Sequence, residues 1–191
     1  MTKGRLEAFS DGVIAILITI MVLELHAPED PTLDALPKVA PGLLSYVLSF
    51  VFLGIYWSNH HHLIQASKVV DGRVLWANLH LLFWLSLVPF GTAWMGQNDF
   101  ATIPVALYGV PLVMAAIAYW ILVRTLIATP GQPDTLSTAI GGDLKGKLSI
   151  VAYVVAIPSA FVAPAISLAI YVGVAATWFV PDRRMERALG R

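Results

Sequence analysis

The chain has 191 residues, of which 58% are hydrophobic and 13% are charged, with a net formal charge of zero and a mean hydropathy of +0.75. Soluble domains carry about 25% charged residues, so this composition indicates an integral membrane protein. The lack of net charge argues against a nucleic-acid partner, and the absence of cysteine excludes disulfides, thiolate nucleophiles and cysteine-based zinc sites.

Six stretches are expected to cross the membrane, given that a helical span needs about 20 apolar residues. They cover residues 5–25, 41–65, 74–95, 101–127, 148–162 and 163–180, and the last two are short. Pro158 and Pro164 lie near the last junction, where proline ends or begins a helix. The sequence therefore predicts an all-α integral membrane protein with six transmembrane helices, forming a single domain over residues 1–191.

Basic residues gather on one side of the membrane if the six spans alternate in direction. The opposite side then carries Lys38 alone among the twelve basic residues. The other eleven are Lys3, Arg5, Lys68, Arg73, Arg124, Lys145, Lys147, Arg183, Arg184, Arg187 and Arg191. The positive-inside rule predicts that both termini lie in the cytoplasm, with the protein in the cell membrane.

The first span carries an apolar stripe that is a candidate pore lining. On a helix, Ile16, Ile20 and Leu23 lie on one face, with Thr19 at its edge and Phe9 on the same side. Rings of branched apolar side chains can gate a pore by dewetting, and a threonine hydroxyl can replace part of an ion's hydration shell. The alternative is an ordinary helix or lipid contact, since apolar stripes are common.

Ser10 and Asp11 give the first span a polar start, which is costly in a membrane unless the groups face protein, water or ions. They point away from the apolar stripe, so we expect them to face neighbouring helices of the same subunit. Polar groups in apolar helices usually pair with one another. The sequence predicts a network that fixes the tilt of the first helix and contains Arg5, Ser10, Asp11, His60 or His61, and Asn78.

Three consecutive histidines, His60 to His62, lie near the cytoplasmic end of the second span. Adjacent residues fan around a helix, whereas metal ligands need to converge on one face or from several helices, so no metal site is expected. A proton relay is a second interpretation, because histidine titrates near neutral pH. Hydrogen-bonded packing between helices is the interpretation that the sequence favours.

Motifs for catalysis are absent from the sequence. There is no glycine-rich phosphate loop, His-Glu-x-x-His motif or nucleophile elbow, so neither an enzyme nor a cofactor is expected. The Thr-Val-Gly-Tyr-Gly filter of familiar potassium channels is also missing. No internal repeat is visible, which disfavours an inverted-repeat transporter.

Three motifs resemble those of one family. The segment Arg5-x-x-x-Phe9-Ser10-Asp11, continuing through Ile16, resembles the first-helix signature of the bacterial transmembrane protein 175 family, relatives of the endosomal and lysosomal potassium channel. Trp57-Ser-Asn-His60-His61 and Trp76-Ala-Asn78-Leu79, with Leu87-Val-Pro89-Phe90, resemble its second and third helices. The resemblance covers residues 5–90.

The resemblance implies a homotetramer in which four first helices line a central pore without a re-entrant filter. It also implies that the narrow rings fall on Ile16, Ile20 and Leu23, with Thr19 between them. Phe9 and Trp57 belong to its motifs and join the predicted structural network. The implied function is passive, potassium-selective cation conduction. A proton-coupled transporter or a proton-conducting channel that uses the membrane histidines stays open as the alternative.

Overall fold

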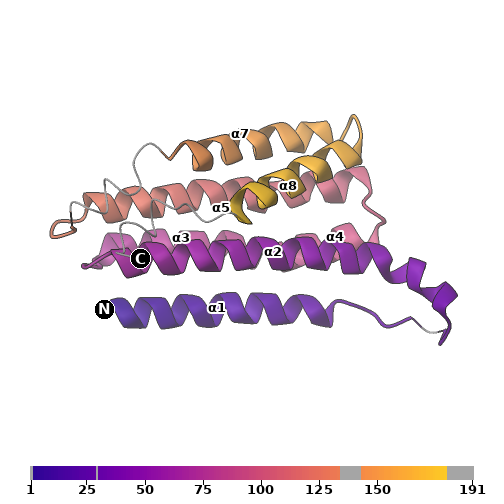
Figure 1. Cartoon of the computed structure of the whole chain (residues 1–191), viewed down its shortest axis with the longest axis horizontal. Helices are drawn as coiled ribbons and strands as arrows, with labels where there is room; N and C mark the ends of the chain where they lie inside the picture. The colour runs from indigo at the N-terminus through magenta and orange to yellow at the C-terminus, as the bar shows by residue number, and fades with distance from the viewer. Residues whose placement is uncertain (1, 29, 134–142, 180–191) are drawn as a thin grey trace.

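The computed structural model describes residues 2–28, 30–133 and 143–179 (Figure 1). Within these ranges the chain is helical and has no strand, which confirms the all-α prediction. Residue 180 of the last predicted span and the arginines at 183, 184, 187 and 191 lie outside the described ranges. The helices are α1 (Lys3–Leu23), the short 3₁₀-helix η1 (Leu33–Ala35), α2 (Leu36–Ala66), α3 (Gly72–Ser86), α4 (Val88–Gln97), α5 (Thr102–Ala128), α7 (Leu144–Ser159) and α8 (Pro164–Phe179).

Four helical stretches are long and apolar enough to cross a membrane, namely Lys3–Leu23, Leu33–Ala66, Gly72–Gln97 and Thr102–Ala128. The helices α7 and α8 have 16 residues each and fall short of that length. When α3 and α4 are counted as one span, the helical segments correspond to the six that the sequence predicts. The largest difference is at the second span, which begins at Leu36 instead of residue 41, because Pro37 lies in the first turn, where no backbone donor is needed.

The third span has defined signals at its start and at its middle. Asp71 caps α3 by accepting a hydrogen bond from the Val74 backbone N–H at 3.0 Å. That bond, with Arg73 beside it, holds the pKa of Asp71 below its ordinary value, so the cap is charged at neutral pH. Pro89 lacks an N–H and interrupts the hydrogen-bond ladder, which separates α3 from α4 at Leu87.

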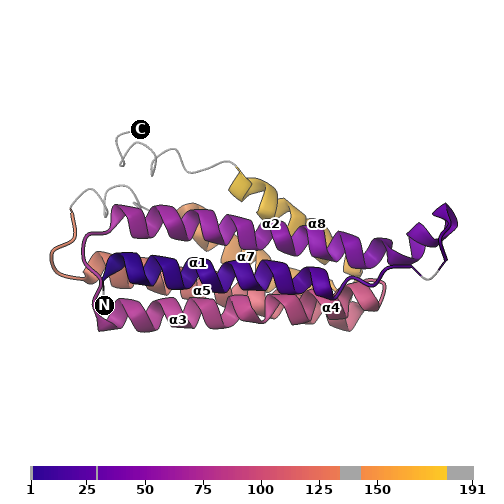
Figure 2. The same ribbon diagram turned by 90° about the horizontal axis from the view of Figure 1, so that it is seen from below.

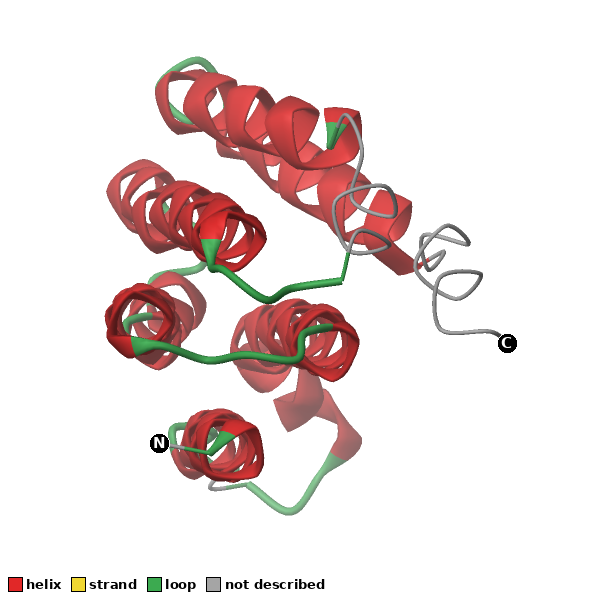
Figure 3. Ribbon diagram, turned by 90° about the vertical axis from the view of Figure 1, so that its left-hand side faces the viewer, coloured by secondary structure: helices red, strands yellow, loops and turns green. Residues whose placement is uncertain are grey.

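The helices form a bundle with α1 at one edge and the α7–α8 pair at the other (Figures 1 and 3). Helix α5 lies between them and packs against α3, α4, α7 and α8. Helix α1 packs against α2, α3 and α4, and Figure 2 shows it lying between α2 and α3. Because α1 lies at an edge, one of its faces has no covering helix.

Two glycines bring α2 and α4 into close contact near the end of α1. A Cβ atom added at Gly96 would lie 2.8 Å from the Cα of Gly42 and 2.5 Å from Ser45 Oγ. Backbone approach through small residues is a common way for membrane helices to pack. A side chain at residue 96 therefore has to move one backbone away from the other.

We expect Gly96→Ala to destabilise the protein by about 1–3 kcal/mol, the usual cost of overpacking. The matched control is Gly54→Ala in the middle of α2, where nothing lies within 4 Å of an added Cβ. Alanine is the better helix former, so this control should keep or raise stability. Thermal unfolding in detergent measures both, and equal midpoints for the two variants would contradict the close packing.

Candidate pore-lining helix and its anchoring contacts

The apolar stripe predicted for a pore lies on the uncovered face of α1. Ile16 is 57% exposed and Leu23 is 77% exposed, and Thr19 and Ile20 are exposed between them. The opposite face of α1 is buried against the bundle, and its side chains are Leu6, Ser10, Ile14, Leu17 and Met21. The helix therefore has one anchored face and one open face.

Thr19 is the polar member of the open face. Its hydroxyl lies 3.1 Å from the Ala15 carbonyl and 3.0 Å from the Ile16 carbonyl, and it donates its proton to the backbone. A hydroxyl that donates its proton keeps its lone pairs as acceptors. The open face thus presents an oxygen acceptor between apolar side chains.

Arg5 and Phe9 extend the open face toward the start of α1, and both are exposed. The side chain of Arg5 has no hydrogen bond or ion pair with any other residue that the structure describes. The predicted contact between Arg5 and the polar network is therefore not formed. Arg5 belongs to the same face of α1 as Ile16, whereas Ser10 and Asp11 face the bundle.

Ser10, His60 and Asn78 meet in the buried interface between α1, α2 and α3. Asn78 Nδ2 donates to Ser10 Oγ at 2.9 Å, and His60 Nε2 lies 2.7 Å from Asn78 Oδ1. All three residues are fully buried. Because the amide oxygen only accepts, His60 must carry a proton on Nε2. His60 Nδ1 is buried without a partner among the described residues.

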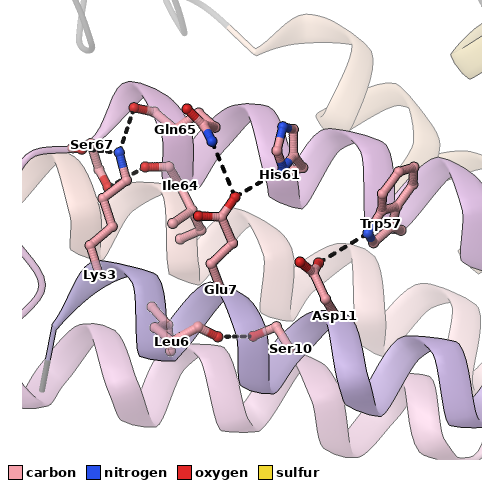
Figure 4. A network of polar contacts seen from close by, with 10 residues as sticks. All are labelled: Lys3, Leu6, Glu7, Ser10, Asp11, Trp57, His61, Ile64, Gln65 and Ser67. Carbon is pink, nitrogen blue, oxygen red and sulfur yellow. Dashed lines mark hydrogen bonds and ion pairs between the residues drawn. The ribbon is translucent and has the colours of Figure 1, made fainter.

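Asp11 bonds to Trp57, which is a member of the predicted network, and to neither of the histidines, His60 and His61, that the prediction placed with it. Trp57 Nε1 donates to Asp11 Oδ1 at 3.0 Å (Figure 4). His61 instead lies one turn further along α2 and contacts Glu7, with 2.9 Å between His61 Nδ1 and Glu7 Oε1. Gln65 Nε2 also donates to Glu7 Oε1, at 3.3 Å.

Lys3 completes this row of contacts at the start of α1. Its ammonium donates to the backbone carbonyls of Gln65 at 2.8 Å and Ser67 at 3.0 Å (Figure 4). It thereby satisfies carbonyls at the C-terminal end of α2, where a cation is also favoured by the helix dipole. We call this row the α1–α2 ladder, formed by Lys3, Glu7 and Asp11 of α1 with Trp57, His61, Gln65 and Ser67 of α2.

Four members of the ladder were not predicted from the sequence, namely Lys3, Glu7, Gln65 and Ser67. A signal for them exists, because Lys3, Glu7 and Asp11 are spaced by four residues and therefore share one face of a helix. Each four-residue step along α1 is matched by a four-residue step back along α2, as expected of antiparallel helices. The ladder and the buried Ser10 contacts together fix α1 on two sides.

The histidines do not converge on a metal site. In the part of the chain that the structure describes, no three His, Cys, Asp or Glu side chains are placed to hold one ion. His60 turns toward Asn78, His61 toward Glu7, and His80 accepts a hydrogen bond from Trp84 Nε1 at 2.9 Å. These contacts are hydrogen-bonded packing contacts, which is the interpretation of the histidines that the sequence favoured.

Comparison with known proteins places this geometry in context. The family model described as "Endosomal/lysosomal potassium channel TMEM175" matches residues 5–89, which carry the open face and every member of the α1–α2 ladder except Lys3. A protein of Chryseobacterium sp. (strain P1-3), named a potassium channel, is 52% identical over 189 residues, covering 99% of this chain and 98% of that protein. The endosomal/lysosomal proton channel TMEM175 of Gallus gallus is 37% identical over 75 residues, covering 33% of this chain and 15% of that protein.

A solved structure is similar over almost the whole chain. The crystal structure of a lysosomal potassium-selective channel TMEM175 homolog from Chamaesiphon minutus matches with a TM-score of 0.82 and 25% sequence identity. The match covers 94% of this chain and 97% of that one. Sequence identity along nearly the full length, the matching family model and the shared fold show that the chain belongs to the TMEM175 family of endosomal/lysosomal potassium channels.

Proposed function

We propose that this protein is a potassium-selective channel that conducts passively through a pore lined by α1. The observation that carries the proposal is the open face of α1, which combines apolar side chains with the Thr19 oxygen at the edge of the bundle. The relatives named potassium channels support the choice of ion. The protein lies in the cell membrane with both termini in the cytoplasm, as its basic residues favour.

The pore requires several copies of the chain, and we propose a homotetramer. A second exposed apolar surface lies on α3 and α4, where Trp76, Phe83 and Phe90 recur at seven-residue intervals. Two different surfaces on one subunit suit a head-to-tail contact, which closes into a ring when the rotation between subunits allows it. A closed ring of this kind directs the open faces of α1 toward a common axis.

Conduction in this arrangement depends on partial loss of the ion's water. Rings of Ile16, Ile20 and Leu23 form an apolar constriction, which opposes the passage of hydrated ions. The Thr19 oxygens replace part of the lost hydration, and potassium gives up its water more readily than sodium. Because no cage of carbonyl oxygens is formed, we expect moderate selectivity for potassium.

Flux measurements in proteoliposomes test the proposed activity. Vesicles loaded with potassium should release it down its gradient faster than matched vesicles release sodium. Chemical cross-linking of the same detergent preparation should yield species of up to four subunits. Absence of flux under any gradient, with the intact oligomer confirmed, would overturn the channel proposal and return the transporter to consideration.

Proton conduction is the second candidate function, and two observations favour it. Vertebrate relatives are named proton channels, and His60 is buried next to α1 in a continuous chain of hydrogen bonds with Asn78 and Ser10. A route through this histidine predicts that His60→Gln removes proton flux and keeps potassium flux. Equal effects on both fluxes would contradict such a route.

A further inference from the structure

A cavity with aromatic walls lies among α2, α5, α7 and α8, far from the open face of α1. The volume that the centres of water molecules can occupy in it is about 40 Å³. This is room for about three waters. Its walls include Phe52 and Tyr56 of α2, Tyr119 of α5, Tyr153 of α7 and Trp178 of α8. Figure 1 shows α7 and α8 at the edge of the bundle opposite α1.

Two tyrosine hydroxyls in this cavity have no hydrogen-bond partner among the described residues. Tyr153 is 3% exposed, and neither it nor Tyr56 forms a side-chain hydrogen bond with a described residue. Among the described residues, the side-chain nitrogen and oxygen atoms that are both inaccessible and without a hydrogen-bond partner are His60 Nδ1 and Trp120 Nε1. The two tyrosine hydroxyls are not among these atoms, so they are accessible from the cavity. Buried polar groups normally have partners, and an unpartnered hydroxyl here points to an occupant.

One carboxylate, that of Asp143, and one ammonium group, that of Lys145, lie beside the cavity. Asp143 lines it and caps α7, accepting a hydrogen bond from the Gly146 backbone N–H at 2.9 Å through Oδ1. The indole of Trp178 is held in place because its Nε1 donates to Ser149 Oγ at 2.8 Å. The ammonium of Lys145 lies 4.6 Å from the centre of that ring, so this indole already receives one cation on its face.

We propose that the cavity binds an organic ammonium cation, of the size of a trimethylammonium head group. Five aromatic side chains line this small space, with one carboxylate beside them. Aromatic side chains gathered around a small space are the chemistry that recognises such cations. A space for about three waters fits a compact head group and excludes an extended chain. The proposal concerns binding alone and is independent of the proposed conduction.

Calorimetric titration of the purified oligomer tests the proposal with three probes. Choline and tetramethylammonium should bind, whereas 3,3-dimethylbutan-1-ol, which has the same shape without the charge, should bind about tenfold more weakly or not at all. Equal binding of choline and the uncharged analogue would show that shape alone is recognised and would overturn the proposal.

Variants of the cavity walls locate the binding. Trp178→Leu should weaken choline binding about tenfold. Asp143→Asn should weaken it too, while the amide oxygen keeps the helix cap. Lys145→Gln should strengthen it, because a competing cation is removed. Trp94→Leu, which changes an indole on α4 outside this cavity, is the matched control and should bind as the native protein does.

An unchanged affinity in Trp178→Leu, with the native oligomer retained on size-exclusion chromatography, would overturn the site.

The cation could come from a lipid head group or from a soluble ammonium ion, and binding measured in nanodiscs distinguishes these two sources. Weaker apparent binding of choline in phosphatidylcholine than in phosphatidylglycerol supports a lipid head group as the occupant. The same affinity in both lipids supports a soluble ammonium ion.

Discussion

Replacement of Ile16 by asparagine is expected to raise cation flux about tenfold and to bring the potassium-to-sodium ratio close to one. Ile16 lies on the open face of α1, 57% exposed in the single subunit, at one of the proposed apolar rings. A polar ring holds water and removes the dewetting barrier, and a tenfold rate change corresponds to about 1.4 kcal/mol. Leu23→Asn should act in the same direction. Proteoliposome flux with potassium and sodium in parallel measures both effects.

The matched control is Val155→Asn. Val155 is 51% exposed on α7, at the opposite edge of the bundle from α1, so the same chemical change is made on a surface that lines no pore in the proposal. Its flux and selectivity should equal those of the native protein. If Val155→Asn raised flux as much as Ile16→Asn, the effect would be a general loosening of the bundle and α1 would not be the pore lining.

The spans and the two faces of α1 follow from the sequence because both are local properties. Hydropathy depends on consecutive residues, and the direction of a side chain depends on the helical repeat. The opposite orientations of Ser10 and Ile16 could therefore be predicted without any neighbour. Prolines at residues 89 and 164 mark helix starts for an equally local reason, since proline fits the first turn.

The partners across helix interfaces could not be predicted with the same accuracy. Asp11 was expected to meet a histidine, but the register of α1 against α2 places it opposite Trp57 and places His61 opposite Glu7. A shift of one turn exchanges these partners, and register is set by packing along both helices. The aromatic cavity could not be predicted from the sequence for the same reason, since its walls come from four separate helices.

Replacement of Asn78 by leucine is expected to destabilise the protein by about 2–5 kcal/mol. Asn78 links Ser10 Oγ and His60 Nε2, and both partners are fully buried. Leucine has a similar volume, so the cost comes first from His60 Nε2, which is left buried without an acceptor, at about 1–3 kcal/mol. Ser10 Oγ loses the bond from Asn78 but still donates to the Leu6 carbonyl at 2.9 Å, so its share is the smaller one, at about 1–2 kcal/mol. In thermal unfolding of the oligomer, the midpoint should fall by roughly 4–20 °C. Asn98→Leu, at an exposed asparagine after α4, is the control and should cause little change.

A double-mutant cycle separates the hydrogen bonds from simple packing. Ser10→Ala removes the acceptor that Asn78 Nδ2 uses, so its cost should be smaller in the Asn78→Leu background than in the native protein. Contacting residues of one network show coupling of about 0.5–3 kcal/mol, and we expect a value in that range. Strict additivity would mean that the bond between α1 and α3 contributes nothing to stability. The anchoring of α1 would then rest on its apolar face and on the α1–α2 ladder.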